Sequence, residues 1–171
     1  MNVLALCLLF SCTSASAAEI SRVATDFDRD GKPDIVSISY VPGNENALAV
    51  TVELSHGTSV RNQVLLRRAG QNGEAGASLK VLSNGRVQLS SVKDWSSSNN
   101  SLDVVLSYRG GLIISAVDYA WDFRGAFGGC NYDFARGTLL VNGKSRRYSA
   151  RVLKFTETSS VDKYAAECVK L

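Results

Sequence analysis

Leu79-Lys80-Val81-Leu82-Ser83-Asn84-Gly85-Arg86-Val87-Gln88-Leu89-Ser90 is the stretch that decides the fold of this 171-residue chain. Apolar and polar residues alternate on each side of Asn84-Gly85, as they do in strands that bury one face. Asn-Gly is the dipeptide that a tight hairpin turn prefers, because both turn positions need a positive φ. We therefore predict two antiparallel strands, 79–83 and 86–90, joined at Asn84-Gly85.

The same alternation continues on both sides of this hairpin. Turn-forming residues such as Gly110-Gly111 and Asn142-Gly143 separate the apolar runs, and 69–77, 96–101 and 125–129 are predicted to be loops. Short strands with regular turns predict an all-β antiparallel meander, curled into a sandwich or barrel. The further predicted strands are 35–41, 47–55, 60–67, 102–109, 112–123, 137–141 and 146–155.

The pattern changes only near the C-terminus. Val161, Tyr164, Ala165 and Cys168 follow the i, i+3, i+4, i+7 spacing of one helix face, so a short helix is predicted there. In an oxidising compartment, Cys130 and Cys168 form an even pair and indicate a disulfide that would attach this helix to the sheet. Two separate buried thiols are the alternative.

The N-terminal segment indicates export. Residues 1–17 are uncharged, with a short apolar run and an Ala15-Ser16-Ala17 triplet, which is the form of a cleaved signal peptide. The apolar run is too short to span a bilayer, so no transmembrane segment is expected. Residues 18–171 then form a single all-β domain, periplasmic or secreted. The alternative is a lipoprotein anchored through Cys12, since Leu9-Phe10-Ser11-Cys12 resembles a lipobox.

Charge and histidine content exclude several function classes. The net charge is +3 and the basic residues are scattered, so neither nucleic acid nor an anionic membrane is an expected partner. His56 is the only histidine, and we interpret it as an exposed turn residue, which leaves little for a catalytic triad. Asp118 with Asp122 or Asp133 is the carboxylate pair that a hydrolase would need, but nothing in the spacing selects it. We therefore predict that the protein is not an enzyme.

An acidic loop carries the clearest chemistry. Its carboxylates fall at Asp26, Asp28, Asp30 and Asp34, and Gly31 permits a sharp turn after the third. Ca²⁺ takes several oxygen ligands from short loops of this kind. The predicted ligands are the side chains of Asp26, Asp28, Asp30 and Asp34 with the backbone carbonyl of Lys32. The alternative is an acidic surface turn that binds nothing, in which crowded carboxylates repel one another.

The motif D-x-D-x-D-G-x-x-D, followed by an apolar strand, resembles the calcium loops of FG-GAP/VCBS-type repeats over residues 20–41. The resemblance implies the same Ca²⁺ ligands, but those families repeat the loop many times and this chain has one copy, so a propeller is not expected. An EF-hand is excluded because its twelfth position would be Ser37 within a strand. The second half of the chain is similar to small exported bacterial proteins with one such Asp loop, a resemblance that implies export.

A second candidate site lies in the predicted strand 112–123. Tyr119 and Trp121 alternate with Asp118 and Asp122, and Arg124 follows. Alternation of this kind usually means that the aromatic face lies in the core and the charged face in water. The alternative is a partner surface, because aromatic residues and Arg are frequent in binding hot spots.

The sequence therefore predicts an exported Ca²⁺-binding β domain with a structural ion, acting as a protein- or glycan-binding module of the cell envelope. The first alternative is a periplasmic inhibitor or immunity-type protein that blocks a secreted toxin. Both classes are small and exported, and neither needs catalytic groups. A hydrolase is the third possibility, and it has the least support in the sequence.

Overall fold

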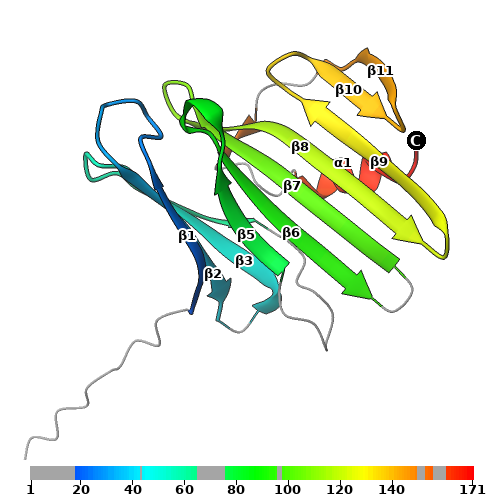
Figure 1. Ribbon diagram of the computed structural model, residues 1–171, viewed down its shortest axis with the longest axis horizontal. Coiled ribbons are helices and arrows are strands. Elements are labelled where there is room, and N and C mark those ends of the chain that lie inside the picture. Colours follow the sequence, from blue (N-terminus) through cyan, green and yellow to red (C-terminus); the bar gives the residue numbers. More distant parts are fainter. Residues whose placement is uncertain (1–17, 43, 65–75, 96–97, 150–152, 156–160) are drawn as a thin grey trace, which may run out of the picture.

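The computed structural model describes residues 18–171 except 43, 65–75, 96–97, 150–152 and 156–160 (Figure 1). The predicted signal peptide 1–17, including Cys12, lies outside the described residues, as does most of the predicted loop 69–77. In the part of the chain that is described, no helix has the length and apolar character needed to cross a membrane.

Two antiparallel sheets pack together (Figure 1). The smaller sheet has the strand order β1-β2-β3-β4, and the larger has the order β11-β10-β9-β8-β7-β6-β5, with β12 paired to β8 beyond the end of β9. The smaller contains β1 (Glu19–Thr25), β2 (Asp34–Val41), β3 (Asn44–Glu53) and β4 (Ser59–Val64). The larger contains β5 (Gly76–Val81), β6 (Val87–Trp95), β7 (Ser98–Tyr108), β8 (Leu112–Phe123), β9 (Ala126–Asp133), β10 (Thr138–Val141), β11 (Lys144–Arg147) and β12 (Leu153–Lys154).

Apart from β12, strands that are neighbours along the chain are neighbours in each sheet, so the predicted antiparallel meander is confirmed. Over the described residues the arrangement is a sandwich, and neither sheet closes into a barrel. The hairpin at Asn84-Gly85 is also confirmed, since Val81 pairs with Val87 and Leu79 with Leu89. Its connection is a 3₁₀ turn, Ser83–Gly85, in which Asn84 and Gly85 both have positive φ.

One hydrophobic core lies between the sheets, and the period-two pattern places its residues. In β2, Val36 and Ile38 are fully buried while the residues between them are partly exposed. The same alternation buries Val104 of β7 and Val117 of β8. The inward faces of strands from both sheets therefore meet in a single core.

Four sequence-based boundaries are wrong. Gly76 and Ala77 belong to β5 rather than to the predicted loop 69–77. Residues 98–101 belong to β7 rather than to a loop, because their backbones pair with β6 and β8 although their side chains are polar. Residues 126–129 similarly belong to β9, paired with the end of β8. The predicted strand 146–155 is two separate strands, β11 and β12. β1 was not predicted, because its core-facing residues Ile20 and Val23 are three positions apart and break the period-two pattern of a strand.

The C-terminal helix α1 (Val161–Cys168) is confirmed, and so is the disulfide between Cys130 and Cys168. The two Cα atoms are 5.7 Å apart, within the ordinary range for a disulfide. The helix also packs through aromatic rings, because Tyr164 lies 4.9 Å from the Tyr132 ring and 5.0 Å from the Phe134 ring, centroid to centroid. The disulfide and the aromatic cluster together hold α1 on β8 and β9.

The aromatic cluster consists of Tyr132, Phe134, Tyr148 and Tyr164. Its tyrosines predict that the stability of the fold decreases at alkaline pH. Burial raises the pKa of Tyr132, Tyr148 and Tyr164, and the nearby Glu167 carboxylate raises each further. A raised folded-state pKa means that the unfolded chain loses its tyrosine protons first, so stability present below about pH 10 should fall as the pH rises above it. Tyr148→Phe should make this fall shallower, measured by urea unfolding at about pH 8 and about pH 11. Equal declines in the variant and the wild type would contradict the assignment.

Candidate metal centre

The acidic loop connects β1 to β2, which are antiparallel neighbours paired up to Thr25 and Asp34. Arg29 and Gly31 both have positive φ, at 68° and 86°, so the backbone reverses its direction tightly here. In an antiparallel meander, alternate connections lie at the same end of the sheet. Figure 1 shows the β1–β2, β3–β4, β5–β6 and β7–β8 connections together at one end of the molecule.

Asp34 organises the loop from inside. Asp34 is fully buried, with 0% of the residue exposed to solvent. Oδ2 accepts hydrogen bonds from the N–H groups of Phe27 at 2.7 Å and Asp28 at 3.1 Å, while Oδ1 accepts from the Ser55 N–H at 2.7 Å. A buried carboxylate with three backbone donors is well compensated. Asp34 therefore joins the acidic loop to the β3–β4 connection.

Asp26, Asp28 and Asp34 each place a carboxylate oxygen within 4.8 Å of the others. Ca²⁺–oxygen distances of about 2.3–2.6 Å put two ligands of one ion at most about 5.2 Å apart, so this group fits around a single ion. Among the described residues, Asp26 Oδ1 is a buried side-chain oxygen that lacks a hydrogen-bond partner. Its other oxygen, Oδ2, accepts from the Gly31 N–H at 3.2 Å. A buried, unpartnered carboxylate oxygen beside two other carboxylates is the arrangement that a hard cation satisfies.

Asp28 connects this group to His56. The Asp28 side chain is 6% exposed, its Oδ1 accepts from the Asp30 N–H at 3.1 Å, and its Oδ2 lies 3.5 Å from His56 Nε2. The His56 side chain is 47% exposed, as its turn position predicted, and its Nδ1 lies 3.1 Å from the Thr58 hydroxyl. Sequence reasoning missed this contact, although the meander itself indicates that the β1–β2 and β3–β4 connections share one end of the sheet.

Asp30 lies outside the group of three. Its Oδ2 accepts from the Ser55 hydroxyl at 2.6 Å and its Oδ1 from the Lys32 N–H at 2.8 Å. The Ser55 hydroxyl bond, with the Lys32 N–H bond second, holds the pKa of the Asp30 carboxyl below its usual range. The geometry thus brings together three of the four predicted carboxylates. Ligation by Asp30 and by the Lys32 carbonyl remains a prediction.

The second candidate surface divides between two faces of β8. Asp118 and Asp122 are exposed, and Asp118 Oδ2 accepts from the Asn131 side chain at 3.0 Å. Tyr119 packs against the core, and Trp121 is half-buried over Gly128, where a Cβ would come within 2.7 Å of the indole. Arg124 lies in the β8–β9 turn with its guanidinium carbon 5.2 Å from the centre of the Phe123 ring. Its use as a partner surface remains a prediction.

Comparison of the chain with protein-family models, with curated proteins and with solved structures finds no match in any of the three. The fold and the site themselves give the class of this protein. It is an all-β domain of two packed antiparallel sheets, with a Cys130–Cys168 disulfide and an acidic triad, Asp26, Asp28 and Asp34, that can hold a metal ion.

Proposed function

We propose that this protein is an exported Ca²⁺-binding β domain whose ion is structural, and that it serves as a protein- or glycan-binding module of the cell envelope. The observation that carries the metal assignment is Asp26 Oδ1, a buried oxygen without a partner among the described residues. It belongs to the same group as Asp28 and Asp34. All the donors of that group are carboxylate oxygens, which hard cations prefer to softer nitrogen or sulfur ligands.

A bound ion would act on the fold rather than on a substrate. It would neutralise Asp26, Asp28 and Asp34, whose charges otherwise repel one another at close range. Because Asp34 also joins the loop to Ser55, order in the acidic loop would be passed to the β3–β4 connection. The disulfide supports export, since such bonds persist in oxidising compartments outside the cytoplasm.

Asp28→Asn tests this proposal through the sign of its effect. The amide keeps an oxygen to accept the Asp30 N–H but removes one charge from the group. In EGTA the variant should be at least as stable as the wild type, because one repulsive charge is gone. In Ca²⁺ it should lose most of the gain that binding gives the wild type, about 2.7 kcal/mol at a hundredfold excess over Kd. For a domain of this size that gain is a melting-temperature rise of about 5–11 °C.

Asp118→Asn is the matched control, since it removes the same charge from an exposed position on β8. Its melting temperature should rise in Ca²⁺ as much as that of the wild type. The measurement is thermal unfolding followed by circular dichroism in both buffers. If Asp28→Asn and Asp118→Asn respond to Ca²⁺ equally, the acidic triad is not the site at which the ion acts.

A further inference from the structure

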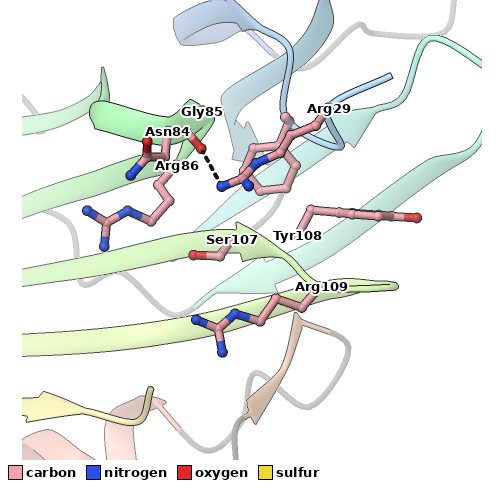
Figure 2. A pocket seen from close by; sticks show the side chains of 8 residues that line it. Arg29, Asn84, Gly85, Arg86, Ser107, Tyr108 and Arg109 are labelled. Carbon is pink, nitrogen blue, oxygen red and sulfur yellow. Dashed lines mark hydrogen bonds between the residues drawn. The ribbon is translucent and has the colours of Figure 1, made fainter. Parts of the chain in front are cut away.

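The acidic loop also forms one wall of a pocket. Its carboxylates alternate with Phe27 and Arg29, and these two residues line the pocket, which has a volume of about 250 Å³ (Figure 2). The opposite walls come from the β5–β6 turn and from the end of β7 with the turn that follows it. Three arginines, Arg29, Arg86 and Arg109, line the pocket together with Phe27, Ser107 and Tyr108.

The three arginines come from three separate connections and converge on one cavity. In the view of Figure 2 their guanidinium groups surround the Ser107 side chain. The lining contains no acidic side chain, and no ion pair joins Arg29, Arg86 or Arg109 to a carboxylate within the described part of the chain. Three like charges around one small cavity repel one another unless an anion lies between them.

The guanidinium groups keep donors for a ligand. Arg29 Nη2 donates to the Asn84 carbonyl and Arg86 Nε donates to the Ser83 carbonyl, each at 3.4 Å. A guanidinium carries five N–H donors, so several remain on each side chain after these long contacts. Planar guanidinium groups bind phosphate and carboxylate oxygens in pairs, which gives both strength and orientation.

The backbone holds two of the arginines in place. Gly85 has a φ of +71°, and a Cβ on it would lie 2.6 Å from the Asp26 carbonyl oxygen, so the turn that carries Arg86 packs directly on the acidic loop. Arg29 has a φ of 68°, a conformation that costs free energy for a residue other than glycine.

We propose that the pocket formed by Arg29, Arg86 and Arg109 binds a tetrahedral oxyanion, a phosphate or a sulfate. Its volume is below the roughly 300–1,000 Å³ of sites that enclose a whole drug-sized ligand, so it holds one group rather than a large molecule. Three cationic forks match the several oxygens of a phosphate or sulfate better than the two oxygens of a carboxylate. The proposal does not require the metal, because Arg86 and Arg109 lie outside the acidic loop.

The test is a titration followed by NMR of the arginine Nε–Hε signals, at constant ionic strength held with chloride. Inorganic phosphate is added in EGTA, because calcium phosphate would precipitate, and sulfate is added in both EGTA and Ca²⁺. Acetate is the carboxylate arm. Glucose 6-phosphate and glucose 6-sulfate show whether the pocket accepts the group only as a free ion or also on a sugar. We expect saturable shifts with phosphate and sulfate, and weaker ones with acetate.

Variants locate the site. Arg86→Ala and Arg109→Ala should each weaken phosphate and sulfate binding about tenfold, as the loss of one charge-assisted contact implies. Arg136→Ala is the control, because it removes an exposed arginine from the β9–β10 turn, away from the pocket. Binding to the wild type that both pocket variants weaken, and Arg136→Ala does not, supports the proposal.

Two results would contradict the proposal that the pocket binds an oxyanion. One is the absence of saturable shifts up to about 10 mM phosphate or sulfate, where a site of millimolar affinity would be mostly filled. The other is equal weakening by Arg136→Ala, which would indicate general surface charge. Neither result bears on the metal proposal, since Ca²⁺ stabilisation is measured separately. Conversely, if Ca²⁺ does not stabilise the protein but sulfate still binds in EGTA, the pocket proposal is supported and the metal proposal is wrong.

Discussion

Replacing Cys130 and Cys168 together with alanine is expected to lower the free energy of unfolding by about 4 kcal/mol. The two cysteines are 38 residues apart in sequence, and closing a loop of that length restricts the unfolded chain by this amount in the chain-entropy model. Alanine is chosen because both cysteines are buried, at 2% and 4% exposure, and a serine hydroxyl there would lack a partner. The midpoint of thermal unfolding should fall by about 8–16 °C.

The aromatic contacts of α1 provide the comparison for this variant. Tyr164 packs on Tyr132 and Phe134 without help from the disulfide, so the helix should remain docked in the folded double variant. The measurement is urea unfolding of the oxidised wild type, the reduced wild type and the double-alanine variant. The reduced wild type should match the variant. A loss below about 1 kcal/mol would mean that the disulfide adds little to what packing already provides.

Asp34→Ala should cost about 3–5 kcal/mol in EGTA, and more in Ca²⁺ because it also removes one proposed ligand of the ion. The side chain accepts from the N–H groups of Phe27, Asp28 and Ser55, and its removal leaves these donors without their acceptor. Asp34→Asn should destabilise the protein somewhat less than Asp34→Ala. Its amide oxygen can still accept hydrogen bonds on one side, but its amide nitrogen would face N–H donors on the other. The cost in EGTA distinguishes Asp34 from Asp28, whose replacement by asparagine should be destabilising only in Ca²⁺.

Asp103→Ala is the control for Asp34→Ala. Asp103 lies on β7, directly opposite Asp118 of β8, and accepts a single hydrogen bond from Gln88 at 2.8 Å. Loss of that bond is offset by relief of the like-charge pair, so the change should stay within about 1 kcal/mol. The free energies would be obtained from urea unfolding in EGTA and in Ca²⁺. An Asp34→Ala variant as stable as Asp103→Ala would contradict the internal role assigned to Asp34.

Most of the fold was accessible from local pattern. The hairpin at Asn84-Gly85 follows from two positions that need positive φ, and β2 follows from its alternating Val36 and Ile38. The disulfide required only an even pair of cysteines, with Cys168 on a helix that packs on β8 and β9. Two of the missed stretches, 98–101 and 126–129, are rich in polar residues or glycine. Their strand structure comes from pairing with neighbours rather than from any preference of their own.

The residues of the candidate site likewise include some that a sequence motif predicts and others that only the fold brings together. Asp26, Asp28 and Asp34 could be predicted because a loop motif contains all three. Ser55 and His56 could not be assigned from a motif, because sheet topology brings them to the loop from about 20 to 30 residues away. The arginine pocket is harder still, since Arg29, Arg86 and Arg109 are scattered in sequence and come together only when three connections meet at one end of the sandwich.

The most direct test of the central claim is a count of Ca²⁺ ions bound to the protein at equilibrium. The protein is dialysed against buffered Ca²⁺ with Mg²⁺ in excess, and calcium and protein are then quantified on both sides of the membrane. The account predicts one Ca²⁺ per wild-type chain, a sharply reduced amount for Asp28→Asn, and one per chain for Asp118→Asn. No bound Ca²⁺ on the wild type at millimolar free ion, or equal amounts on Asp28→Asn and Asp118→Asn, would contradict it.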